Sequence, residues 1–244
     1  MVSQRSRSKT TEALAPRFAA TMDGERLLSV FKSLVEPIGQ SLPLTTEVVL
    51  HDLSLLPNSI VAIHGNVTGR SVGDPATDLL LEQLVHGNQD HRIGYSSSLP
   101  DGTQLRSATM LIRDIAGNAV AAICINSDIS AWSVVERVAQ SFLGRTPEVP
   151  VVSVGTASES FVKDLDELAS IMIGKAIADV GVPVELMKKP HKIQVVRSLK
   201  SRGMFLLRDA VEMIAASLKV TRFTIYNYLN EIGDDADKSE RKSG

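Results

Sequence analysis

The feature that most constrains the fold is a run of three β-rich segments joined by very short turns. Residues 93–99, 103–114 and 119–129 are separated by a Pro-Asp-Gly turn at 100–102 and an Ala-Gly-Asn turn at 116–118. Turns of about 2–5 residues join antiparallel strands, whereas a parallel connection needs about a dozen residues or more. The sequence therefore predicts an antiparallel meander.

Two more β-rich segments and a helix come before this meander. Residues 47–53 (EVVLHDL) and 59–65 (SIVAIHG) are short and rich in β-branched residues, as strands are. A helix is expected over 75–86, because Asp74 can cap it and Pro75 suits its first position. Together these segments predict an α+β domain whose antiparallel sheet is covered by helices on one face.

Two amphipathic helices are expected to flank the sheet. Residues 23–39 and 131–143 place apolar side chains at helical spacing. Asp23 is the expected cap of the first helix, and Pro37 should kink or end it. The apolar faces of both helices exceed what one side of a sheet of short strands can cover. We therefore expect a homodimer built through this domain, or a tetramer.

The remainder of the chain is helical after a proline-containing connection. Residues 161–181 and 192–203 have the apolar spacing of helices. Two prolines and small polar residues separate them from the α+β domain, which is typical of a boundary. The expected organisation is a mobile polar tail at 1–22, the α+β domain at 23–144, a linker at 145–160, an all-α domain at 161–233 and a charged tail at 234–244.

Composition limits the class of protein. A hydrophobic fraction of 43% supports packed cores. No apolar run approaches the roughly 18 residues of a membrane span, and the first residues lack the apolar centre of a secretory signal. The single cysteine, Cys124, excludes an internal disulfide and a cysteine-rich zinc site. These features predict a cytoplasmic protein that does not associate with membranes.

Residues 209–232 have the pattern of a helix-turn-helix. Thr221 can cap the second helix with its hydroxyl group. Along that helix Ile225, Leu229 and Ile232 form an apolar stripe. With the stripe inward, polar and aromatic side chains face out and suit the major groove, where Arg pairs with guanine and Asn with adenine. The predicted DNA-binding residues are Lys219, Thr221, Arg222, Phe223, Thr224, Tyr226, Asn227 and Asn230.

Charge supports a contact with double-stranded DNA in this region. Residues 183–232 carry nine Lys/Arg against four Asp/Glu, in a chain whose net charge is −2. Lys219 stands where such turns usually have glycine, which costs about 1 kcal/mol if the turn needs a positive φ. Two alternatives stay open. One is a signalling or scaffolding protein that binds another protein through its helical C-terminus, and the other is a small-molecule enzyme.

At this point the sequence resembles a known family. The segment GMFLLRDAVEMIAASLKVTRFTIYNYLNEI (203–232) resembles the C-terminal helix-turn-helix of the DauR-like bacterial transcriptional regulators. Four segments are similar to the YheO-like PAS domain that precedes it in that family: HDL (51–53), GNVTGRSVGDPATDLLL (65–81), DGTQLRSATMLIRD (101–114) and CINSD (124–128). The resemblance implies a PAS-like sensor fold, a DNA-binding C-terminus and regulation of transcription. Named regulators of this type concern D-arginine utilisation, so an amino acid such as D-arginine is an implied class of ligand.

A small polar metabolite is the expected signal for the sensor domain. His51 and Asp52 alternate faces, so only one of them can point inward. The glycine-rich loop after the second strand has N–H groups that suit an anion, and Arg70 or Arg106 suits a carboxylate. The predicted ligand-binding residues are His51, Asn66, Thr68, Arg70, Ser71, Arg106, Ser107 and Asn126.

Catalytic, metal and cofactor sites are not expected. No Ser or Cys lies in a nucleophile-elbow context, and Cys124 in the apolar run AVAAICI suits a buried core position. His86 and His91 are five residues apart, which is off the helical spacing of a metal-binding pair. The prediction is a regulator without a catalytic residue, a metal or a cofactor.

Overall fold

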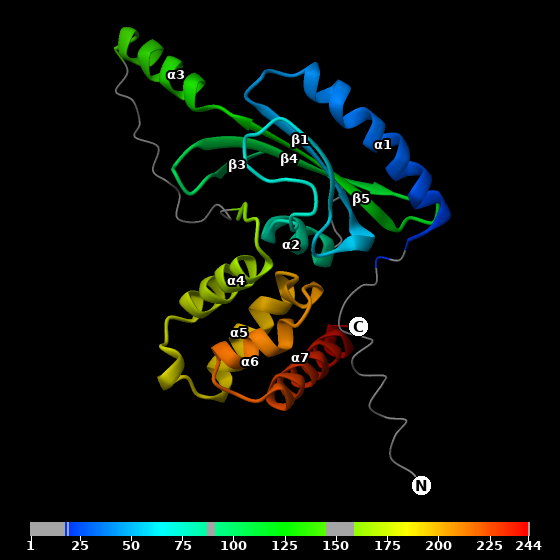
Figure 1. Ribbon diagram of the computed structural model, residues 1–244. Coiled ribbons are helices and arrows are strands. Elements are labelled where there is room, and N and C mark those ends of the chain that lie inside the picture. The colour runs from blue at the N-terminus through cyan, green and yellow to red at the C-terminus, as the bar shows by residue number, and fades with distance from the viewer. Residues whose placement is uncertain (1–17, 19, 87–90, 145–158, 244) are drawn as a thin grey trace. The chain divides into compact units, whose positions relative to one another are not determined.

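The structure is a computed structural model that describes residues 18, 20–86, 91–144 and 159–243, with side chains up to Gly233 (Figure 1). The described chain forms two compact units. The first unit contains Phe18–Leu79 and the described residues between 88 and Lys163, and it holds the sheet. The second unit contains residues 80–86, which belong to a helix that begins in the first unit, and the C-terminal helices from Asp164 onward.

The first unit is built on a five-stranded antiparallel sheet with the strand order β2-β1-β5-β4-β3. Its strands are β1 (Thr46–Asp52), β2 (Ile60–His64), β3 (His91–Ser98), β4 (Gln104–Arg113) and β5 (Ala119–Asp128). The predicted meander is confirmed as β3-β4-β5, and β1 pairs with β5 through residues far apart in sequence. The α+β class is therefore confirmed for this unit.

Helix α1 (Met22–Gln40) packs on one face of the sheet (Figure 1). The core between them is apolar and consists of Val35, Val48, Leu50, Val120, Ala121 and Ile123. The predicted cap was wrong by two residues, because Thr21 accepts the N–H of Gly24. Asp23 instead accepts the N–H of Ile115 at 3.0 Å. Pro37 lies inside the last turn, and the helix ends at Gln40.

Helix α2 (Asp78–His86) begins three residues later than predicted. Asp74 does not cap it, because its carboxylate accepts the N–H of Ser71 at 2.7 Å. From Leu80 onward α2 clusters with the C-terminal helices. A Cβ on Gly203 would lie 2.7 Å from the Leu81 carbonyl oxygen. This close approach, at a φ of +77°, needs glycine.

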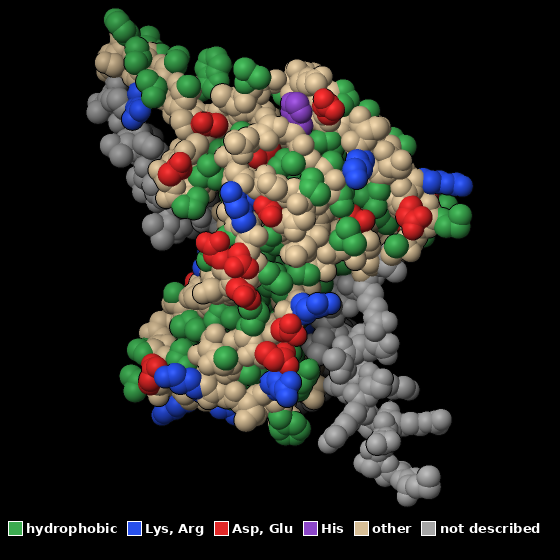
Figure 2. All heavy atoms as spheres, in the orientation of Figure 1, with side chains coloured by type: hydrophobic (Ala, Val, Ile, Leu, Met, Phe, Trp, Pro, Cys, Tyr) green, Lys and Arg blue, Asp and Glu red, His purple; other side chains and the backbone are tan. Residues whose placement is uncertain are grey.

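Helix α3 (Ser130–Phe142) follows β5 and extends beyond the end of the sheet (Figure 1). Of its side chains, none is buried against the described part of the chain. Its apolar positions, including Trp132, Val135 and Phe142, are exposed. Hydrophobic side chains gather along this helix in Figure 2. The helix is amphipathic as predicted, but the sheet does not cover it.

The second unit is all-helical. Besides α2 from Leu80 onward, its helices are α4 (Leu165–Val180), α5 (Lys189–Ser201), α6 (Ala210–Ser217) and α7 (Arg222–Ser243). Its core is apolar and includes Leu168, Met172, Val195, Leu199, Ile214, Leu218 and Ile225. The predicted helix at 161–181 begins at Leu165, because Asp164 accepts the N–H of Asp166 as the cap. Residues 159–163 group with the sheet. Most of the expected mobile tail and most of the expected linker lie outside the described residues, whereas Thr21 and Met22 form the start of α1.

Candidate DNA-binding surface and sensor site

The turn between α6 and α7 has the geometry of a helix-turn-helix. Thr221 accepts the N–H of Thr224 at 3.2 Å, so its predicted role as the cap is confirmed. The N–H of Val220 donates to the Ala215 carbonyl at 3.0 Å, which closes the end of α6. Lys219 has a φ of +53°. The turn therefore needs the left-handed conformation that glycine adopts most easily, and a lysine adopts it here.

Helix α7 separates the two faces that the sequence predicts. Ile225, Leu229 and Ile232 are buried, and Tyr228 is buried beside them, which the sequence pattern did not indicate. The eight predicted DNA-binding residues lie together on the turn and the first turns of α7. Six of them are exposed and two are half-buried: Lys219, Thr221, Arg222, Phe223, Asn227 and Asn230 are exposed, while Thr224 and Tyr226 are half-buried.

Two of the predicted DNA-binding residues, Lys219 and Arg222, form ion pairs with carboxylates. Arg222 lies 2.9 Å from a Glu212 oxygen, and Lys219 lies 2.7 Å from a Glu185 oxygen. The same partners lower the pKa of the carboxyl groups of Glu212 and Glu185. These side chains are all about half exposed or more, and such surface pairs are worth only about 0–1 kcal/mol. A phosphate or a base edge can therefore replace the carboxylate partner at small cost.

In the sensor unit, the face of the sheet opposite α1 is polar and buried. Strand alternation puts Glu47, Val49 and His51 of β1 on this face, while Val48 and Leu50 point to α1. The buried polar side chains of the sheet and its loops include Glu47, His51, Arg70, Thr77, Ser97, Ser107, Thr109, Asn126 and Glu159. Buried polar groups require hydrogen-bond partners, so these side chains form a network beside a small apolar cluster of Val49, Ile60 and Cys124.

Glu47 is the centre of this network. Its carboxylate accepts the N–H groups of Val67 and Thr68, each at 3.0 Å, and the Thr68 hydroxyl at 2.8 Å. It also accepts the Asn126 amide at 3.3 Å and lies 3.8 Å from an Arg70 nitrogen. These donors compensate the burial of its charge.

Arg70 is buried on the same face. Its Nε donates to the Thr68 hydroxyl at 3.0 Å, and its guanidinium lies 5.2 Å from the centre of the Phe161 ring. Its Nη1 has no hydrogen-bond partner among the described residues. A buried guanidinium nitrogen without a partner is a strong unused donor.

His51 points inward, and Asp52 caps the following turn through the N–H of Ser54. The sequence had left open which of these two neighbours is buried. The Nδ1 of His51 lies 2.9 Å from the Ser59 hydroxyl, whereas its Nε2 has no partner among the described residues. Burial, helped by the charge on Arg70, lowers the pKa of His51 to about 3. Its imidazole is therefore neutral at pH 7.

Five of the eight predicted ligand-binding residues lie on this polar face: His51, Thr68, Arg70, Ser107 and Asn126. The other three do not join them. Asn66 and Ser71 are exposed loop residues, and Arg106 is exposed on the opposite side of β4 from Ser107. Adjacent strand residues point to opposite faces, so Arg106 and Ser107 cannot line one pocket.

The sequence reasoning missed several members of the network. Glu47 precedes Val49 by two residues and His51 by four, so the alternation of the strand places all three on the same face. This signal is present in the sequence. Tyr95 donates to Glu159 at 3.0 Å and lies 3.0 Å from the Thr109 hydroxyl. Glu159 also accepts the Thr77 hydroxyl at 2.8 Å, a contact across 82 residues that no local pattern indicates. Burial raises the pKa of Glu159 to about 6.

Cys124 also lies on the polar face and is buried. Its Sγ lies 3.5 Å from the Thr109 hydroxyl, and burial raises the pKa of its thiol to about 12. A neutral thiol is a poor nucleophile. Among the described residues, no group of three or more His, Cys, Asp or Glu is placed to hold a metal ion.

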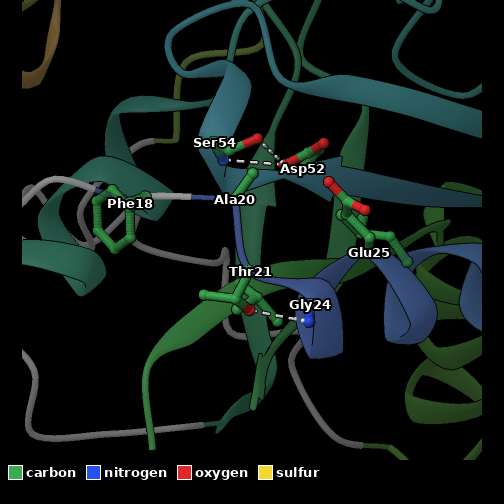
Figure 3. A pocket seen from close by; sticks show the side chains of 9 residues that line it. Phe18, Ala20, Thr21, Gly24, Glu25, Asp52 and Ser54 are labelled. Atoms are coloured by element: carbon green, nitrogen blue, oxygen red, sulfur yellow. Dashed lines mark hydrogen bonds between the residues drawn. The ribbon is translucent and has the colours of Figure 1, made fainter. Parts of the chain in front are cut away.

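A small cavity of about 150 Å³ lies between the start of α1 and the end of β1 (Figure 3). Three of its polar residues, Thr21, Asp52 and Ser54, are engaged in capping, and Glu25 also lines it. Thr21 accepts the N–H of Gly24, and Asp52 accepts both the N–H and the hydroxyl of Ser54. None of the predicted ligand-binding residues lines it.

An α+β unit with a buried polar sheet face, followed by a helical unit with a polar helix-turn-helix surface, defines a transcriptional regulator with a sensing domain. The YheO-like PAS domain family matches residues 22–144, and an HTH domain family matches residues 168–230. The chain belongs to the family of YheO-like PAS-domain regulators. It is a DNA-binding transcriptional regulator and not an enzyme.

Three relatives match over most of their length. Transcriptional regulator DauR of Pseudomonas aeruginosa is 30% identical over 193 residues, which is 78% of this chain and 87% of that protein. An uncharacterized protein of Haemophilus influenzae is 26% identical over 90% of this chain and 97% of its own length. Uncharacterized protein YheO of Escherichia coli K12 is 24% identical over 84% of both chains. In the described part of the chain, every helix is too short or too polar to cross a membrane.

Proposed function

We propose that the turn and first half of α7 read base edges in the major groove of double-stranded DNA in the cytoplasm. The observation that carries this is that Arg222, Asn227 and Asn230 are all exposed at the start of α7, whose apolar stripe is buried. Arg222 would pair with guanine and Asn227 with adenine, while Lys219 would contact a phosphate. A protein-binding helix would present a more apolar surface at this place.

Binding titrations on fragments selected by the full-length protein from genomic DNA test this assignment. Arg222→Ala and Asn227→Ala are each expected to cost about 1–3 kcal/mol in specific binding and to relax discrimination at one base position. Lys219→Ala is expected to weaken all sequences alike and to lower the salt dependence of binding, as loss of a phosphate contact does. Unchanged affinity in both the Arg222 and Asn227 variants would remove α7 from the DNA interface.

The sensor unit is proposed to bind a small polar metabolite that carries a carboxylate, such as an amino acid. D-arginine is one candidate, by resemblance to the named regulators of the family. The support is the pair of buried nitrogens without described partners, Nη1 of Arg70 and Nε2 of His51, on a face otherwise saturated with hydrogen bonds. An arginine side chain with a free donor suits a carboxylate.

This proposal is tested by adding single D- and L-amino acids to the protein on its selected DNA fragment. A metabolite that binds the sensor should change DNA affinity by about 5–150-fold. Arg70→Lys is expected to abolish that response, because lysine cannot bind a carboxylate bidentately. The affinity of the unliganded variant for the same fragment is measured beside it. A full response in the Arg70 variant would exclude this guanidinium as the recognition group.

The protein is further proposed to act as a homodimer, or as a tetramer built from dimers, through α3. This helix exposes Trp132, Val135, Val138 and Phe142, and the sheet leaves them uncovered. A second copy is the expected partner, because one helix-turn-helix offers few base contacts and such regulators gain specificity by binding two half-sites.

A further inference from the structure

Three consecutive residues ahead of the DNA-binding unit dock on the polar face of the sensor. Glu159 accepts hydrogen bonds from Thr77 and Tyr95. Ser160 donates its N–H and its hydroxyl to the two oxygens of Asp78, at 2.7 and 2.9 Å. Phe161 lies under the guanidinium of Arg70, 5.2 Å from it. All of these residues belong to the sensor unit, so this docking is internal to it.

The carboxylate of Glu159 is held in an unusual way. It is 4% exposed, and its two direct donors are the neutral hydroxyls of Thr77 and Tyr95. The charge on Arg70 acts on it from nearby and lowers its pKa, but burial outweighs this effect. At the same time Nη1 of Arg70 is buried and has no described partner. The site thus offers a carboxylate two hydroxyl donors and a guanidinium that its present occupant does not pair with.

We propose that Glu159 is an internal occupant of a carboxylate subsite, and that a carboxylate-bearing metabolite displaces the segment 159–161 from it. The subsite consists of Thr77, Tyr95 and Arg70. A free ligand can place its carboxylate on Nη1 of Arg70 as well as on the two hydroxyls, which Glu159 does not do. This deepens the proposed sensing function and rests on it, because it names the group of the metabolite that the sensor recognises.

The position of the segment gives the displacement a route to the DNA-binding unit. Only Val162 and Lys163 lie between Phe161 and Asp164, which caps α4 at the start of the helical unit. Release of 159–161 therefore frees the residues immediately before α4. A ligand that binds only when the segment is released shifts the equilibrium from the docked to the released form. Such a shift can control DNA affinity if the two forms bind DNA differently.

Hydrogen exchange on the full chain tests the docking. In Glu159→Ala, peptides covering 159–163 are expected to exchange at least about tenfold faster than in the wild type, because the hydroxyls of Thr77 and Tyr95 lose their acceptor. Glu167→Ala is the matched control, since it makes the same change at an exposed site in the first turn of α4. Equal exchange in the two variants would overturn the docking role of Glu159.

Acetate tests the subsite itself, because it resembles the CH2–COO⁻ group that Glu159→Ala removes. Sodium acetate is expected to raise the melting temperature of Glu159→Ala more than sodium chloride at equal ionic strength. The excess should vanish in the double variant with Tyr95→Phe. It should also be absent in the wild type, where the tethered carboxylate has the advantage of high effective concentration. No excess over chloride in Glu159→Ala would overturn the carboxylate subsite.

Coupling is read on a DNA fragment selected by the wild-type protein. Glu159→Ala is expected to change the protein's affinity for that fragment by at least about fivefold, whereas Glu167→Ala leaves it unchanged. The same affinity in both variants would overturn the regulatory role of the segment. These failures differ from failure of the proposed function, which would appear in the wild type as no selected DNA or as no response to any amino acid.

Discussion

Replacement of Lys219 by glycine and by alanine measures the strain in the helix-turn-helix. Lys219 has a φ of +53°, a conformation that costs an L-residue about 1–2 kcal/mol and glycine almost nothing. Glycine has a cost of its own, because the greater freedom of the unfolded chain removes about 0.4–1 kcal/mol. Both variants lose the exposed ion pair with Glu185, so its contribution cancels between them. We therefore expect Lys219→Gly to be about 1 kcal/mol more stable than Lys219→Ala.

The measurement is urea unfolding of both variants, followed by circular dichroism at the helix band. The only tryptophan, Trp132, lies in α3 of the sensor unit and does not report on the turn. The wild type should lie near the glycine variant or between the two, because it keeps both the strain and the ion pair. If the alanine variant equals or exceeds the glycine variant in stability, the left-handed turn does not carry the strain assigned to it.

Further predictions concern pH, DNA and assembly. Glu159 has a pKa raised to about 6 when folded, so its contribution to stability is full below its ordinary value of 4.5 and is lost as pH rises through 6. The loss in the free energy of unfolding amounts to about 2 kcal/mol, and Glu159→Gln should remove it. Urea midpoints of both proteins across pH 4–7 measure this difference. His51 titrates in the same way in both proteins, so its effect cancels. Glu212→Gln should tighten DNA binding about two- to fivefold in a gel-shift titration, because Arg222 no longer has a competing carboxylate; weaker binding would contradict this. Trp132→Asp should convert a dimer of the full chain to monomer in sedimentation experiments, and an unchanged mass would exclude α3 as the interface.

Local sequence determined a large part of the architecture. The short turns at 100–102 and 116–118 fixed an antiparallel meander, because so few residues cannot form a crossover. The spacing of Ile225, Leu229 and Ile232 fixed which side of α7 is buried, and Thr221 fixed where this helix begins. In each case the controlling residues lie within a few positions of one another.

Tertiary contacts decided what these local rules do not reach. Alternation alone gives two faces to every strand and does not say which loop or segment covers the polar one. Glu159 accepts a hydrogen bond from Thr77, which is 82 residues away in the sequence. Gly203 packs closely against the Leu81 carbonyl, which is more than a hundred residues away. Such contacts depend on which hydrogen-bond donors surround a buried charge and on how closely the backbone segments pack. Both are properties of the assembled core, so the sensor network and the division of α2 between the two units emerged only with the structure.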